Sequence, residues 1–194
     1  MDNQNKWLGL INKKNILILL GAVIVVEVLW AGWTLYQTNR QIVQTVPPVA
    51  TKPQPTQIEL RTDKTSVKVG EKFTVSINML SDKSTDGADL IINYDPKLLL
   101  AEPLTLGTLY NEYPKNTIDA RAGKITVSGI STATDGIKPN GLFGSMVFTA
   151  KGQGQSSISL EFTPGSTVDT NIIEQGTGKD ILEKVKNVEV TISP

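Results

Sequence analysis

The sequence predicts a mostly β protein, in which an antiparallel β-sandwich domain follows one transmembrane helix and a proline-rich linker. Three observations lead to this prediction. One long apolar run lies near the N-terminus, four prolines follow it within a short polar stretch, and the remaining residues show short period-two patterns separated by turn signals. These features divide the chain into residues 1–15, 16–36, 37–57 and 58–194.

The composition excludes several classes of function. The chain contains neither histidine nor cysteine, which removes Ser-His-Asp triads, thiol nucleophiles, disulfides and the usual zinc ligands. No pair of carboxylates is marked as a glycosidase site, so we expect neither an enzyme nor a cofactor. Residues 58–194 carry 14 Lys and Arg against 17 Asp and Glu, a net charge of −3 with no basic stripe. Nucleic acid is therefore not an expected partner.

The apolar run at residues 16–36 predicts an uncleaved membrane anchor. As a helix, its 21 residues span roughly 31 Å, which is the thickness of a bilayer core. No small-residue cleavage motif follows closely, which argues against a removed signal peptide. Lys6, Lys13 and Lys14 precede the run, so the positive-inside rule places the N-terminus in the cytoplasm. We expect a single-pass cell-membrane protein with residues 58–194 outside the cell.

One charged residue, Glu27, interrupts this run. A charge at the centre of a bilayer costs about 2.5 to 3.5 kcal/mol on insertion scales. Ala31 and Thr34 follow at i+4 and i+7, so small side chains share the face of Glu27. One interpretation is a contact with another protein in the membrane, with Glu27 protonated or paired. The other is a tolerated charge in an otherwise hydrophobic anchor.

The two segments that follow differ in kind. Residues 37–57 contain four prolines and predict an extended linker that reaches up to about 60 Å, at about 3.1 Å per residue. Residues 58–194 are long enough for one domain with its own core. The longest stretch there with an amphipathic helical pattern is 179–186, so strands dominate the prediction. Apolar positions recur with period two and predict the inward faces of these strands: Phe73, Val75, Ile77 and Met79; Leu90, Ile92 and Tyr94; Ile125 and Val127; Ile158, Leu160 and Phe162; Val188, Val190 and Ile192.

The segment GADLIINYDP at residues 87–96 shows this alternation most clearly. Leu90, Ile92 and Tyr94 face one side, whereas Asp89, Ile91 and Asn93 face the other. The strand ends at Asp95-Pro96, because proline cannot donate to a ladder and restricts the residue before it.

Several motifs, in order, make residues 58–194 resemble the cohesin module of cellulosomes. The Tyr-Asp-Pro-x-x-Leu element is the most specific of them, and the others support it by their order and spacing: SVKVGEKFTVSINM, GADLIINYDPKLL, GKITVSGIS, GLFGSMVFTAKGQGQSSISL, a late element from Val168 to Thr170, and VEVTI. The resemblance implies an antiparallel jelly-roll β-sandwich of about nine strands, a fold shared with some carbohydrate-binding modules. It also implies noncovalent recognition of a protein partner, such as a calcium-loaded dockerin.

The resemblance implies a binding face as well. In the family, an aspartate five residues before the tyrosine of the Tyr-Asp-Pro element contacts the dockerin, and Asp89 holds that position here. Ile91 and Asn93 share its face, and a neighbouring strand adds Thr126, Ser128 and Ile130 if it pairs as in the family. The alternative is that these side chains are only solvated.

Three further interpretations stay open at this stage. Polysaccharide is a possible ligand, for which Tyr110 and Tyr113 are the candidate exposed aromatics, because all three tryptophans precede residue 37. A passive structural role at the cell surface is another. Asp82, Ser84 and Asp86 match the first half of an EF-hand calcium loop, but the second half fails, so we favour a polar hairpin loop with a turn at Asp86-Gly87.

Overall fold

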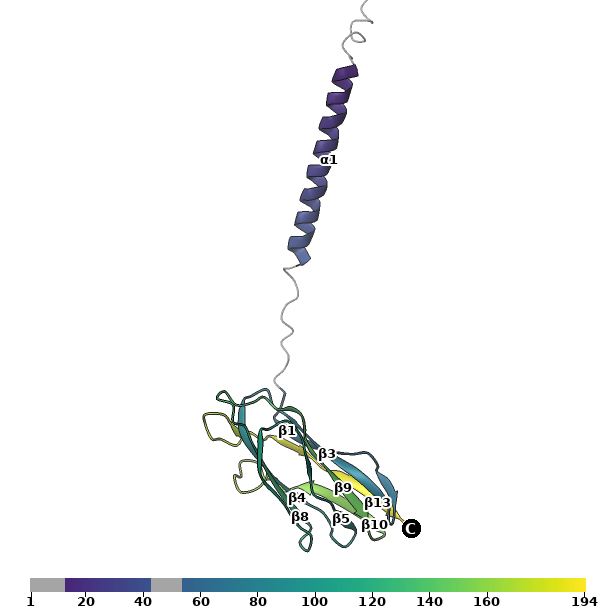
Figure 1. The fold of residues 1–194 in the computed structure, drawn as a ribbon, viewed down its shortest axis with the longest axis vertical. Helices are drawn as coiled ribbons and strands as arrows, with labels where there is room; N and C mark the ends of the chain where they lie inside the picture. The colour runs from purple at the N-terminus through teal and green to yellow at the C-terminus, as the bar shows by residue number, and fades with distance from the viewer. Residues whose placement is uncertain (1–12, 43–53) are drawn as a thin grey trace, which may run out of the picture. The chain divides into compact units, whose positions relative to one another are not determined.

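The computed structural model describes residues 13–42 and 54–194, which form two separate units (Figure 1). The first unit is helix α1 (Lys13–Ile42), and it includes the segment Ile16–Gln37, which is long and apolar enough to cross a membrane. The helix continues to Ile42, through the first residues of the predicted linker. Most of the predicted segment 1–15 and the rest of the linker up to residue 53 lie outside the described residues.

The second unit is a sandwich of two β-sheets. One sheet has the strand order β12-β1-β3-β9-β5, with β6 also paired to β9. Its strands are β12 (Lys184–Lys186), β1 (Gln57–Thr62), β3 (Lys72–Leu80), β9 (Asn140–Ala150), β5 (Leu99–Ala101) and β6 (Thr105–Leu106). The other sheet has the order β2-β13-β10-β4-β8-β7, with β11 also paired to β4. Its strands are β2 (Ser66–Lys68), β13 (Val188–Ser193), β10 (Gly154–Leu160), β4 (Thr85–Asn93), β8 (Lys124–Ile130), β7 (Glu112–Asp119) and β11 (Asn171–Glu174).

The predicted sandwich is confirmed, but the number of strands is not. Residues 54–194 contain 13 strands instead of about nine. Five of them, β2, β5, β6, β11 and β12, have four residues or fewer, which is too short for a period-two pattern to stand out. Two edge pairs, β1 with β12 and β2 with β13, are parallel. The stretch 179–186 forms no helix, and its last three residues are β12.

The core lies between the two sheets and contains the predicted inward residues. Leu90 and Ile92 of β4 and Ile125 and Val127 of β8 are completely buried. The ring of Phe148 in β9 packs against Phe73 of β3 and against Tyr94, which directly follows β4, at centroid distances of 5.6 and 5.4 Å. Phe162 and Val188 are only half-buried, because they lie beyond or at the end of their strands.

The Asp95-Pro96 step ends β4 by turn chemistry. Oδ1 of Asp95 accepts a hydrogen bond from the backbone N–H of Lys97 (2.8 Å), and its carbonyl accepts one from Leu99 (2.9 Å). The carbonyl of Gly123 accepts from the N–H of Tyr94 (2.9 Å). Gly123 has a φ of +68°, and a Cβ there would lie 2.1 Å from the Tyr94 carbonyl oxygen. The turn therefore requires glycine at this position.

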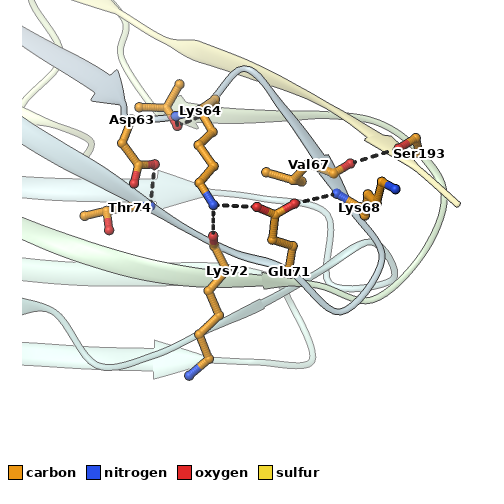
Figure 2. A network of polar contacts seen from close by, with 9 residues as sticks. Asp63, Lys64, Val67, Lys68, Glu71, Lys72, Thr74 and Ser193 are labelled. Atoms are coloured by element: carbon orange, nitrogen blue, oxygen red, sulfur yellow. Dashed lines mark hydrogen bonds and ion pairs between the residues drawn. The ribbon is translucent and has the colours of Figure 1, made fainter.

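A polar network lies at one end of the sandwich, near the C-terminus (Figure 2). Nζ of Lys64 forms an ion pair with Oε1 of Glu71 (2.5 Å), whose Oε2 accepts from the N–H of Lys68 (3.1 Å). Oδ1 of Asp63 accepts from the N–H of Thr74 (2.8 Å). These contacts join the end of β1 to the β2–β3 turn and to β3.

Candidate protein-binding face

Strands β4 and β8 pair as the family resemblance implied, and the pairing brings the six proposed contact residues together. Their antiparallel register places Asp89 opposite Ser128 and Ile91 opposite Thr126. Ile130 lies opposite Gly87, and the pairing needs glycine there, because a Cβ on Gly87 would lie 2.8 Å from the carbonyl oxygen of Gly129. The predicted turn at Asp86-Gly87 is wrong, because both residues lie within β4. Glycine is needed at position 87 because β8 approaches closely there.

The six side chains point away from the core, because they alternate with buried residues on both strands. Asp89 is exposed, Ile130 is 41% exposed, and the others are half-buried: Ile91, Asn93, Thr126 and Ser128. Two apolar isoleucines therefore lie among an acid, an amide and two hydroxyls. This mixture is typical of the core and rim of a protein interface.

Hydrogen bonds orient the polar members of this face. Oγ of Ser128 donates to Oδ1 of Asp89 (2.5 Å), which holds the carboxylate against β8. Nδ2 of Asn93 donates to Oε2 of Glu161 (3.4 Å), and Nζ of Lys124 forms an ion pair with the same oxygen (3.0 Å). Lys124 first, and then Asn93, hold the pKa of Glu161 below its usual value. Glu161 is therefore a carboxylate at neutral pH.

Residues from two flanking strands belong to the same face and were missed from the sequence. On one side, Lys115 and Thr117 of β7 lie opposite Ser128 and Thr126. On the other side, Asn171 of β11 lies opposite Asp89, but its side chain is buried, so it borders this face without adding exposed surface. The pattern in β7 is weakly apolar and β11 has four residues, so neither strand showed which of its side chains face outward. Only the register between distant segments identifies them.

Tyr110 and Tyr113 are not exposed aromatics, so the prediction that they present flat rings to a glycan is wrong. Tyr110 is 3% exposed, and its hydroxyl shares a hydrogen bond with Oγ1 of Thr85 (3.1 Å). The hydroxyl of Tyr113 donates to the carbonyl of Phe143 (3.1 Å). Both rings pack edge-to-face on Phe143, at centroid distances of 5.9 and 5.2 Å. Burial raises the pKa of Tyr110 to about 12.

The two aspartates of the partial EF-hand motif accept hydrogen bonds from different parts of the chain. Oδ2 of Asp82 accepts from the N–H of Gln54 (2.9 Å), whereas Oδ2 of Asp86 accepts from that of Gly176 (3.2 Å). Strand β4 already begins at Thr85, between Ser84 and Asp86, so the three residues do not form one loop. Within residues 13–42 and 54–194, no three acidic, histidine or cysteine side chains gather as a metal site.

The predicted contact residues in the membrane lie along α1. Glu27 and Ala31 are one helical turn apart, and Oγ1 of Thr34 donates to the carbonyl of Ala31 (2.9 Å). This local bond satisfies the hydroxyl within the helix. The contact of these residues with a second protein stays a prediction.

Comparisons with known structures find the same sandwich. A type II cohesin dyad from the adaptor ScaA scaffoldin of Acetivibrio cellulolyticus is 22% identical with a TM-score of 0.59, and the match covers 71% of this chain and 49% of the dyad. A type II cohesin–X-dockerin complex from the same organism is 18% identical with a TM-score of 0.58, covering 71% and 99% of the two chains. A type I complex, Coh-OlpA-Doc918 from Clostridium thermocellum, is 18% identical with a TM-score of 0.55 and the same coverage.

Sequence comparisons give one further result. No curated protein matches the chain. The family model of the cohesin domain matches residues 58–192, which are nearly the whole β-sandwich unit. The chain therefore belongs to the cohesin domain family.

Proposed function

We propose that this protein is a membrane-anchored cohesin that captures a protein partner of dockerin type on the outer face of β4 and β8. The observation that carries the proposal is the register that sets Asp89 beside Ser128 and Ile91 beside Thr126 on one outward face. Membership of the cohesin family supports it, and so do the similar cohesins that are bound to dockerins in the complexes from Acetivibrio cellulolyticus and Clostridium thermocellum.

The chemistry of the face suits noncovalent recognition. Ile91 and Ile130 supply apolar surface for desolvation, while the Asp89 carboxylate supplies a directed acceptor held by Ser128. A carboxylate among apolar and hydroxyl groups can act as a hot spot of an interface when it accepts a hydrogen bond from a donor of the partner. The function proposed is binding without catalysis.

The proposed anchor would hold this binding face close to a membrane. The span Ile16–Gln37 and the lysines before it support an N-terminus in the cytoplasm and an outer domain outside the cell. A tethered cohesin of this kind holds a secreted or surface-bound partner close to the cell. Residues Glu27, Ala31 and Thr34 of α1 are the proposed contact with a second membrane protein.

The double variant Asp89→Arg/Ile91→Glu tests the proposed face. Both side chains point outward, so the fold should persist while binding weakens by more than about 2 kcal/mol, or roughly 30-fold. Glu189→Arg/Thr191→Glu is the matched control, since it makes the same charge changes at two exposed positions of β13 in the same sheet. Binding to purified, calcium-loaded dockerin modules from the source organism is measured by calorimetry.

Two outcomes would contradict the proposal. If the Asp89→Arg/Ile91→Glu variant folds normally by circular dichroism and binds the same dockerin undiminished, the face is wrong. If the native protein binds none of the organism's dockerins, the partner class is wrong.

A further inference from the structure

Asp169, at the end of the loop between β10 and β11, is a buried carboxylate without a cationic partner. It is 5% exposed, and Oδ2 accepts a hydrogen bond from the N–H of Thr163 (2.8 Å). Oδ1 is buried and has no hydrogen-bond partner among the described residues. None of the ion pairs between residues 54 and 194 includes this side chain. An unpaired buried charge is costly, so a compensating group is expected.

A second orphaned oxygen lies two residues further along. Asn171 is 3% exposed, and its Nδ2 donates to the main-chain carbonyl of Asp169 (3.1 Å). Its Oδ1 is also buried without a partner within the part of the chain that the structure describes. Both orphaned atoms are acceptors, so neither can satisfy the other. They require a group that donates or carries positive charge.

The surrounding backbone holds the two residues in place. The N–H of Thr170 donates to the carbonyl of Glu161 (2.9 Å), which closes the loop. Oγ1 of Thr170 accepts from the N–H of Ile91 (3.0 Å), which ties the loop to β4. Asn171 lies directly opposite Asp89, and such paired residues have Cβ atoms about 4.5 to 5.5 Å apart. A second carboxylate is therefore close to the amide of Asn171.

From these oxygens we infer a calcium-binding site at Asp169 and Asn171, at the border of the proposed binding face. Calcium takes carboxylate, amide, carbonyl and water oxygens at 2.3 to 2.6 Å in flexible geometry, which suits a loop that supplies few side chains. Magnesium demands a near-ideal octahedron and fits such a donor set less well. With two or three protein side-chain oxygens, the dissociation constant should lie at about 0.1 to 1 mM. The site does not rest on the proposed function.

The test uses the outer domain, residues 52–194, which forms its own compact unit. The protein is stripped with EDTA and titrated with calcium chloride, without any dockerin, by calorimetry and thermal melting. We expect about one equivalent of calcium per chain and a melting temperature raised by at least about 4 °C at 10 mM calcium. Magnesium at the same concentration should raise it less. Since no partner is present, the result is independent of the binding-face experiment.

Three variants distinguish the site from general calcium effects. Asp169→Asn keeps an acceptor for Thr163 but removes the charge, so it should lose the response to calcium and melt no lower than the native domain in EDTA. Asn171→Asp adds a carboxylate, so it should bind calcium about tenfold more tightly and melt lower in EDTA. Asp135→Asn, at an exposed acid in another loop, should behave as the native domain does.

The proposal is overturned if the native domain shows no response up to 10 mM calcium, or if Asp169→Asn responds as the native domain does. The two oxygens would then bind a buried water instead. If Asp169→Asn fails to fold, the native domain decides, because a water site predicts no stabilisation by calcium beyond that given by magnesium at the same concentration.

Discussion

Gly129 of β8 is where a single methyl group should disturb the core most directly. A Cβ at this position would lie 2.8 Å from Cε2 of Phe143 and 2.8 Å from Cδ2 of Tyr110. Both rings are buried and pack edge-to-face on each other. Tyr110 is also held by its hydrogen bond to Thr85, which opposes its withdrawal. The variant Gly129→Ala therefore inserts volume that the core must absorb by moving a ring or the strand.

The expected cost follows from two opposing terms. Extra volume in a well-packed core costs about 1 to 3 kcal/mol. Replacing glycine by alanine reduces the conformational entropy of the unfolded chain and returns about 0.4 to 1 kcal/mol. We expect Gly129→Ala to lower the free energy of unfolding of residues 52–194 by about 1 to 2 kcal/mol, as measured by urea denaturation at pH 7.

A double-mutant cycle with Phe143→Leu checks the cause. Leucine removes one of the two rings that the methyl group meets, so the double variant should be more stable than the sum of the single changes predicts, by about 1 kcal/mol. If the two changes add within about 0.5 kcal/mol, or if Gly129→Ala is as stable as the native domain, the steric explanation is refuted.

Two other predictions concern charge and topology. Glu59 is 17% exposed, and ion pairs with Arg61 and Lys186, at 2.6 Å each, lower its pKa from 4.5 to about 2. Both partners are 65% exposed and screened by solvent, so Glu59→Gln should cost only about 1 kcal/mol at pH 7. Because the pKa of Glu59 is depressed in the folded state, its contribution to stability is present above pH 4.5 and is lost as the pH falls towards 2. The unfolding free energies of the variant and native domains should therefore converge near pH 2. A difference in unfolding free energy that stays constant with pH would contradict this explanation. For the topology, protease added to intact cells should remove the outer domain, and its survival while a known external protein is digested would show the opposite orientation.

The elements that the sequence determined by itself are those with a local cause. Residues 87–96 alternate with the period of a strand, and this local pattern alone predicts that Leu90 and Ile92 are buried and that Asp89 points outward, as the structure shows. Asp95-Pro96 ends the strand through its own turn chemistry. The apolar run at 16–36 likewise predicts a helix, because length and hydropathy are properties of the segment alone.

Other features depend on contacts between segments that are distant in the sequence, so no local pattern predicts them. Tyr110 has the sequence context of an exposed loop, but Phe143 and Thr85 bury it. Asn171 lies beside Asp89 only because β11 pairs with β4, a register that a four-residue strand does not encode locally. A period-two pattern tells which face a side chain occupies, but not which neighbours share that face, since strand order and register are set by packing over the whole sandwich.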